Sequence, residues 1–258
     1  MGMDDFSGWD GAALVTGGSG GIGRAVVRLL ARRGSNVAFT WRGNEASAES
    51  LAEEATSYGV QVSRHRLDTS DPHACERVVG DVAERHGGLH TLVHAAGPHV
   101  PMTHLSGIDP ELMTRQVGED AGGFFNVSQP ALAHLRAVEG SIVAVTTAAT
   151  TRFPVRDGLS SVPKAAVEAL VRALAVEEGR YGVRANCVGP GMLTDGMAQR
   201  LIESGDLDDR ALDAARANIP LRRFGIAHDV AEAVCFLASA RAGFISGQKL
   251  DVDGGYGA

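Results

Sequence analysis

A serine and a lysine stand four residues apart in the segment Ser160-Ser161-Val162-Pro163-Lys164. On a helix, this spacing puts the Ser160 hydroxyl and the Lys164 ammonium on one face, where they can hydrogen-bond. Such a pair can orient a polar substrate. An aliphatic hydroxyl is a far weaker acid than a phenol, whose pKa is ~10, so Ser160 is a poor proton donor. The pair therefore predicts a site that takes its proton from another group.

A glycine-rich turn near the N-terminus is a candidate phosphate cradle. It reads Thr16-Gly17-Gly18-Ser19-Gly20-Gly21-Ile22-Gly23. The turn stands between an apolar run and a segment with one apolar helical stripe, and the N–H groups that open a helix can approach a pyrophosphate. The alternative, a flexible glycine loop, is disfavoured by this position. We expect these residues of the turn to bind a dinucleotide: Gly17, Ser19, Gly21, Ile22 and Gly23.

The residues after the second apolar run indicate which dinucleotide binds. A carboxylate there would hold the ribose 2′-hydroxyl of NAD, but the stretch contains no acid before Glu45. It offers Arg42 instead, and a guanidinium suits a 2′-phosphate. The alternative role for Arg42 is that of a solvated surface arginine. We expect the cofactor to be NADP(H).

Short β-branched runs alternate with amphipathic segments along the chain, and this alternation predicts how the site is positioned. The predicted strands are Ala12 to Thr16, Asn36 to Trp41, Gln61 to Arg66, Leu89 to His94, Ser141 to Thr146 and Val183 to Val188. Most are too apolar to face water on one side, which is typical of parallel strands covered by helices on both faces. Right-handed crossovers then give a doubly wound α/β sheet of the Rossmann type, with ligands beyond the carboxyl ends of its strands.

The length of the chain predicts its domain organisation. Its 258 residues contain no internal repeat, low-complexity tract or linker. We therefore expect a single domain over residues 1–258. Residues 192–220 are less regular than the rest, and we expect them to form a mobile flap over the substrate.

Charge and cysteine content exclude several classes of partner. The formal net charge of −7 argues against binding to nucleic acid or to an anionic membrane surface. No apolar run approaches the roughly 20 residues that span a bilayer, and we expect no membrane segment and no signal peptide. Cys75, Cys187 and Cys235 lack the spacing of a zinc site or a disulfide framework, so we expect no metal and a reducing, cytoplasmic location.

Several motifs together resemble the short-chain dehydrogenase/reductase family, over nearly the whole chain. They are the glycine-rich turn, Asp68, His94-Ala95-Ala96-Gly97, Lys164, Pro190-Gly191, Gly247-Gln248 and Asp251-Val252-Asp253-Gly254-Gly255. The style is closest to that of the 3-oxoacyl-acyl-carrier ketoreductases. The resemblance implies these further cofactor contacts: Asp68 and Thr69 at the adenine, Ala95, Ala96 and Gly97 along the adenosine ribose, Lys164 at the nicotinamide ribose, Pro190 and Gly191 beside the nicotinamide, and Thr194 at its carboxamide.

The reaction centre departs from the pattern of that family. The family uses a serine after the fifth strand, a Tyr-x-x-x-Lys helix motif and an asparagine on the preceding helix, where this chain has Thr147, Ser160 and Asp120 and keeps only Lys164. Thr147 retains a hydroxyl for a substrate carbonyl. Asp120 can stabilise the Lys164 ammonium, but it cannot donate a hydrogen bond as an amide does. The alternative for Asp120 is a solvent-facing position on a helix made irregular by Gly118, Gly122 and Gly123.

Other residues could supply the proton or contact the substrate. His99 titrates near neutrality and is a candidate donor, its alternative being a solvated loop histidine. Arg152, Arg156 and Asp157 lie in a loop that the resemblance puts at the border of the substrate pocket. Tyr256 is a further candidate if the C-terminal tail reaches a neighbouring subunit.

Three hypotheses for function follow. The first is an NADP(H)-dependent oxidoreductase that interconverts a small-molecule carbonyl and an alcohol. The second is a non-redox enzyme, such as a dehydratase, cyclase or isomerase, with Asp120, His99 or Asp157 as acid or base. The third is a noncatalytic NADPH-binding partner or sensor. The resemblance also implies a homodimer or homotetramer, paired through helices at residues 109–137 and 158–181.

Overall fold

The computed structural model describes residues 5–97, 100–195 and 209–258. Seven parallel strands form one sheet in the order β3-β2-β1-β4-β5-β6-β7. Their bounds are β1 Ala12–Thr16, β2 Asn36–Trp41, β3 Val62–Arg66, β4 Leu89–His94, β5 Ser141–Val145, β6 Arg184–Pro190 and β7 Lys249–Val252. The strand order reverses beside β1, which creates the crevice where ligands bind in such sheets.

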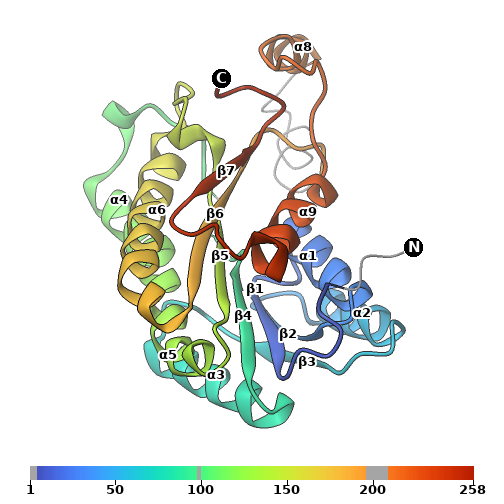
Figure 1. Ribbon diagram of the computed structural model, residues 1–258. Helices are drawn as coiled ribbons and strands as arrows, with labels where there is room; N and C mark the ends of the chain where they lie inside the picture. The colour runs from blue at the N-terminus through green and yellow to red at the C-terminus, as the bar shows by residue number, and fades with distance from the viewer. Residues whose placement is uncertain (1–4, 98–99, 196–208) are drawn as a thin grey trace.

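Helices cover both faces of the sheet, as Figure 1 shows. One layer contains α1 (Gly21–Arg32), α2 (Glu45–Thr56) and α9 (Ala227–Ala238), and the other contains α3 (Pro72–His86), α5 (Gly123–Ala137) and α6 (Gly158–Glu178). Each layer packs its own hydrophobic cluster against the sheet. Two shorter helices, α4 (Pro110–Val117) and α8 (Asp209–Ala217), complete the set in the described residues.

A π-helical turn, Gly118–Gly122, joins α4 to α5 without a break in the helical backbone. Such turns insert an extra residue into a helix and are frequent at functional sites. Gly123 follows directly, and a Cβ atom there would lie 2.7 Å from Oγ1 of Thr69. The lack of a side chain at Gly123 therefore lets the start of α5 pack closely against the loop that follows β3.

The predicted doubly wound sheet and its single Rossmann-like domain are confirmed. The six predicted strands all exist, with ends that differ by one or two residues. The seventh, β7, was not among the predicted strands, because its sequence Lys-Leu-Asp-Val carries two charges and lies at the sheet edge. Much of the predicted flap, residues 196–208, lies outside the described residues, and its mobility stays a prediction.

Candidate functional site

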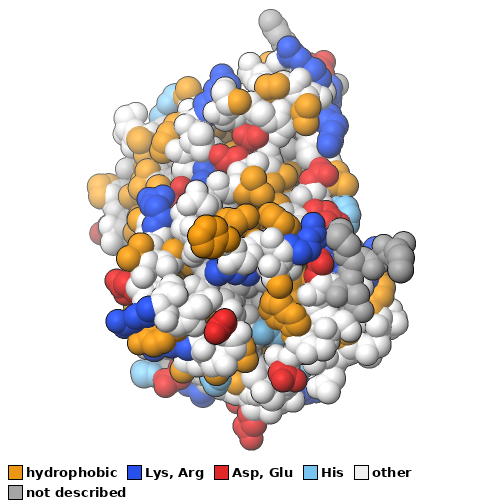
Figure 2. Space-filling view, viewed as in Figure 1, with side chains coloured by type: hydrophobic (Ala, Val, Ile, Leu, Met, Phe, Trp, Pro, Cys, Tyr) orange, Lys and Arg blue, Asp and Glu red, His pale blue; other side chains and the backbone are white. Residues whose placement is uncertain are grey.

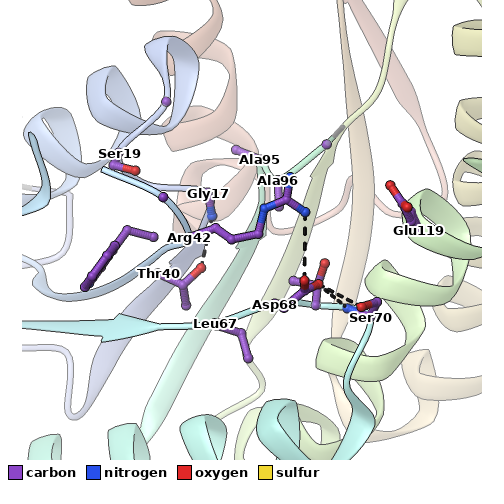
Figure 3. A pocket seen from close by; sticks show the side chains of 15 residues that line it. Gly17, Ser19, Thr40, Arg42, Leu67, Asp68, Ser70, Ala95, Ala96 and Glu119 are labelled. Atoms are coloured by element: carbon purple, nitrogen blue, oxygen red, sulfur yellow. Dashed lines mark hydrogen bonds and ion pairs between the residues drawn. The ribbon is translucent and has the colours of Figure 1, made fainter. Parts of the chain in front are cut away.

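A cavity of about 300 Å³ opens between the ends of β1, β2, β3 and β4 (Figure 3). Eight of the residues expected at the cofactor line it: Gly17, Ser19, Arg42, Asp68, Thr69, Ala95, Ala96 and Gly97. Its wall also contains residues for which no cofactor contact was predicted: Gly20, Thr40, Trp41, Gly43, Leu67, Ser70 and Glu119. The tertiary structure thus brings together four segments at the ends of strands and Glu119 of the π-helical turn, which are separated in the sequence.

The glycine-rich turn is held against the end of β4 by close backbone contact. Gly17 has φ +67°, and a Cβ atom there would lie 2.7 Å from Cα of Ala96. Its N–H group donates to Oγ1 of Thr40 over 3.1 Å. Helix α1 begins at Gly21 with no side-chain cap on its first N–H groups. Uncapped N–H groups at a helix start are the donors that bind phosphate, so the turn fits a pyrophosphate.

Arg42 and Asp68 face each other across the far end of this cavity (Figure 3). Their side chains are 68% and 52% exposed, and Nη1 of Arg42 lies 3.9 Å from Oδ2 of Asp68. The N–H and hydroxyl groups of Ser70 both donate to Asp68, which lowers the pKa of that carboxyl. The long and exposed ion pair leaves the Arg42 guanidinium accessible to a ligand phosphate.

Lys164 reaches the edge of the cavity from α6 and forms an ion pair with Asp120. Its Nζ atom lies 2.6 Å from Oδ1 of Asp120, and the side chains are 14% and 2% exposed. A Cβ atom on Gly97 would lie 3.2 Å from the same Nζ. The alternative that Asp120 faces solvent is therefore wrong, because the π-helical turn directs the carboxylate inward to the ammonium.

The other two positions of the expected reaction centre, Thr147 and Ser160, lie just after β5 and in the first turn of α6. The Oγ1 atom of Thr147 accepts a hydrogen bond from the N–H group of Ala149. The N–H group of Ser160 donates to the carbonyl oxygen of Asp157. Within the described residues, Lys164 donates to Asp120 and not to Ser160. The ammonium that could reach Ser160 is thus engaged by Asp120 in this structure.

His94 ends β4 within the sheet, and its charge state is fixed by burial. Its Nδ1 atom lies 2.9 Å from Oγ1 of Thr16, and its ring meets the ring of Phe124 edge to face. Burial, assisted by the Lys164 ammonium, lowers the pKa of His94 to about 3. The imidazole is therefore neutral at physiological pH and serves as a hydrogen-bonding core residue.

A buried charge network behind Thr147 was missed by the motifs. The Nζ atom of Lys249 lies 3.0 Å from Oδ1 of Asp251 and 3.5 Å from Oε1 of Glu168, and it donates to Oγ1 of Thr150 over 2.5 Å. The Thr150 hydroxyl donates in turn to Glu168 and lies 3.2 Å from the carbonyl oxygen of Thr147. The network ties β7 and α6 to the turn that carries Thr147. Lys249 is 81 residues from Glu168 and 99 residues from Thr150, so no local spacing could have indicated these contacts.

The other predicted cofactor residues that the structure describes lie outside the cavity wall. Pro190 ends β6, Gly191 donates its N–H to the carbonyl oxygen of Val252, and Thr194 donates its N–H to that of Gly225. Gly21, Ile22 and Gly23, the last residues of the glycine-rich turn, form the start of α1. His99 lies outside the described residues.

The arginines of the expected substrate border make local contacts. Arg152 donates to the carbonyl oxygen of Tyr256 over 3.0 Å and stacks on its ring at 4.6 Å. Arg156, which has φ +74°, donates to the carbonyl oxygen of Met102. Both guanidinium groups therefore fasten neighbouring segments in this structure. Asp157 has no hydrogen bond or ion pair through its carboxyl group within the part of the chain that the structure describes.

Comparisons with known proteins decide the family. The family model described as enoyl-(acyl carrier protein) reductase matches residues 17–257. The chain belongs to the short-chain dehydrogenase/reductase family. The versicolorin reductase of Emericella nidulans is 31% identical over 94% of each chain, and the 3-oxoacyl-acyl-carrier-protein reductase of Staphylococcus epidermidis is 31% identical over 95% of this chain and 98% of its own.

Solved structures agree with this assignment. A short-chain dehydrogenase from Burkholderia cenocepacia, solved in complex with NADP, has a TM-score of 0.89 and 30% identity over 98% of this chain and 100% of its own. This short-chain dehydrogenase/reductase therefore shares both fold and length with its relatives. No helix in the described residues is long and apolar enough to cross a membrane. Those residues also contain no cluster of His, Cys, Asp and Glu suited to a metal ion.

Proposed function

We propose that this short-chain dehydrogenase/reductase interconverts a small-molecule carbonyl and an alcohol with NADP(H). One observation carries the proposal: a single cavity runs from the glycine-rich turn at Gly17 to Arg42, and Lys164 stands at its Gly97 edge. The cavity therefore joins a phosphate cradle to the helix that carries the expected reaction centre. The NADP complex of the Burkholderia relative and the reductases among the relatives support this assignment.

Arg42 is the proposed ligand of the 2′-phosphate. Its guanidinium is accessible at the end of β2, and the carboxylate of Asp68, 3.9 Å away, is exposed and not in hydrogen-bond contact with it. A phosphate oxygen can replace that contact with a bidentate hydrogen bond, which is shorter and stronger. The first N–H groups of α1 would hold the pyrophosphate. Asp68 and Thr69 would contact the adenine, and Ala95, Ala96 and Gly97 the adenosine ribose.

The nicotinamide half of the cofactor would lie toward Lys164, with Pro190 and Gly191 beside the ring and Thr194 at the carboxamide. A bound nicotinamide nucleotide supplies or accepts the hydride of the reaction. Lys164 would donate to the ribose hydroxyls while Asp120 balances its charge. Thr147 would donate to the substrate carbonyl oxygen and Ser160 would orient it, because each presents a hydroxyl and neither is an adequate acid.

Self-association belongs to the same proposal. Apolar side chains lie open among charged ones on the face of the molecule shown in Figure 2. On the helices expected to pair subunits, Phe125, Val162 and Val176 are exposed, Val176 by 83%. Apolar side chains on an outer helix face are typical of helix pairing between subunits. A homodimer or homotetramer in the cytoplasm is therefore the proposed state, and the unpaired cysteines fit a reducing compartment.

The decisive experiment measures nucleotide binding and ketone reduction together. The purified protein is titrated with NADPH and NADH by fluorescence and then assayed against a panel of ketones, beside the Ser160→Tyr variant. Preferential NADPH binding and consumption of NADPH with some ketone support the proposal. Turnover by Ser160→Tyr alone would favour a noncatalytic NADPH binder, and product formation without loss of NADPH a non-redox enzyme. Failure to bind either nucleotide would overturn the cofactor assignment.

A further inference from the structure

Reduction of a carbonyl leaves an alkoxide that needs a proton, and the described residues beside Lys164 do not supply one readily. Ser160 is an aliphatic alcohol. His94 is neutral because burial lowers its pKa to about 3. The carboxyl group of Asp120 is already engaged, because it accepts a 2.6 Å hydrogen bond from the Lys164 ammonium. The proposed reaction therefore lacks an evident acid.

Asp157 lies one helical turn before Ser160. It precedes the first residue of α6, and its carbonyl oxygen accepts hydrogen bonds from the N–H groups of Ser160 and Ser161. The spacing from Asp157 to Ser160 and Lys164 is three and seven residues, which places all three on one side of the helix. The bonds to its backbone fix the position of Asp157 relative to the expected reaction centre.

The carboxyl group of Asp157 is partly buried and has no partner in the described part of the chain. It does not cap α6, although it stands at the N-cap position. Next to it, a second cavity of about 380 Å³ opens at Gly158 between the segments at residues 104–106 and 153–156. A Cβ atom on Gly158 would lie 2.6 Å from Cδ2 of Leu105, so the start of α6 is covered closely by an apolar side chain.

Charged groups on the neighbouring elements that the structure describes do not hold this carboxylate. Arg156 belongs to the same loop, but its guanidinium donates to the carbonyl oxygen of Met102. Lys164, further along α6, pairs with Asp120 of the π-helical turn. His104 lines the second cavity on the facing segment. An acid that is partly buried and unpaired in this way retains its proton more easily than a solvated acid.

We propose that Asp157 is the catalytic residue that protonates the product alkoxide, in place of a phenol at position 160. This inference rests on the proposed function. Hydride from the nicotinamide nucleotide forms the new C–H bond, and the π electrons of the carbonyl move to its oxygen. That oxygen takes the proton of the Asp157 carboxyl group, which becomes a carboxylate and regains a proton from solvent. In the reverse direction the carboxylate accepts the alcohol proton.

The acidity of Asp157 fits this role. Desolvation is the cause that raises the pKa of its carboxyl to about 6. At pH 7, a carboxyl group with that pKa is protonated in about a tenth of the molecules. A carboxyl group with an ordinary pKa near 4 is protonated in about a thousandth of them. Reduction is therefore expected to slow as the pH rises through 6, and oxidation to accelerate.

The test compares Asp157→Asn with the control Glu177→Gln, which removes an exposed carboxylate at the far end of the same helix. We expect Asp157→Asn to lower kcat for ketone reduction by about 10²-fold and to remove the inflection near pH 6, with NADPH affinity within about twofold of the unmodified protein. Glu177→Gln keeps both the rate and the inflection. The double variant Asp157→Asn with Ser160→Tyr gains a phenol as an acid. Its kcat should be at least tenfold higher than that of Asp157→Asn alone.

A structural role for Asp157 would not produce that rescue, because a phenol at position 160 replaces an acid and not a packing contact. The ¹³C carboxyl signal that disappears in Asp157→Asn should titrate near pH 6 in the unmodified protein. Ordinary titration near pH 4, or an Asp157→Asn variant with unchanged kcat and unchanged inflection, overturns the donor role and leaves the proposed function standing. An unmodified protein that binds NADPH but reduces no ketone overturns the proposed function and the donor role with it.

Discussion

The Nζ atom of Lys164 lies 2.6 Å from Oδ1 of Asp120, and the Asp120 side chain is 2% exposed. A buried ion pair such as this stabilises a fold little compared with an apolar pair, but removal of one partner leaves an uncompensated charge. The pair connects α6 to the π-helical turn between α4 and α5. It therefore fixes the cation of the expected reaction centre beside the end of β4.

Removal of the Asp120 carboxylate should destabilise the protein. We expect Asp120→Ala to lower the free energy of unfolding by about 3 kcal/mol, because Lys164 is then buried without a counter-charge. Asp120→Asn should cost less, since an amide oxygen still accepts from the ammonium. Urea denaturation measures both. The surface pair Arg115–Glu119, 4.0 Å long, supplies the control, and Glu119→Ala should cost less than about 1 kcal/mol. Equal losses for Asp120→Ala and Glu119→Ala would contradict the interpretation.

Substitution of Arg42 should change nucleotide preference. In Arg42→Ala the 2′-phosphate loses a charge-assisted hydrogen bond, so the Kd for NADPH is expected to rise about tenfold or more, while the Kd for NADH stays within about twofold. Fluorescence titration of both nucleotides provides the comparison. Arg85→Ala removes an equal charge from an exposed position near the end of α3 and should affect neither. A parallel loss for both nucleotides would place Arg42 away from the 2′-phosphate.

Substitution of Gly17 tests whether the glycine-rich turn needs a residue without a side chain, and substitution of Gly80 serves as its control. Gly17→Ala should prevent NADPH binding and destabilise the fold, because the residue has φ +67° and its Cβ would overlap the backbone of Ala96. Gly80→Ala lies within α3 with open space around it and should raise the free energy of unfolding by about 0.5–1 kcal/mol. Thermal unfolding and nucleotide titration distinguish the two. Normal NADPH binding by Gly17→Ala would count against the cradle.

The raised pKa of Asp157 should also make the free energy of unfolding depend on pH. Burial raises the pKa of its carboxyl to about 6 from 3.8, so the folded state favours the protonated form. The contribution of that form is complete below the unfolded pKa and is lost as the pH rises from 3.8 through 6. Relative to the unmodified protein, Asp157→Asn should therefore gain about 1–2 kcal/mol between pH 4 and pH 7.5, after allowance for solvent screening. Urea denaturation at the two pH values measures the gain, and no change between them would exclude the raised pKa.

Local sequence patterns were sufficient to predict the strands in the interior of the sheet. The runs at Ala12–Thr16 and Leu89–His94 are entirely buried, and apolar and β-branched side chains predominate in strands that helices cover on both faces. The strand β7 could not be predicted in this way. Its burial depends on one neighbouring strand, β6, and on the ion pair that Lys249 forms with Glu168, which is 81 residues away in the sequence.

The sequence by itself determined the family, the fold and the glycine-rich turn, because these rest on residue types whose backbone or burial requirements are local. It left the orientation of Asp120 open between solvent and Lys164. Only the tertiary structure decided that question, since the π-helical turn rotates the carboxylate inward and α6 supplies the ammonium. The raised pKa of Asp157 was likewise decided by the tertiary structure. Its acidity depends on how much water the fold removes from around its carboxyl group, and desolvation is a property of packing that no spacing of residues encodes.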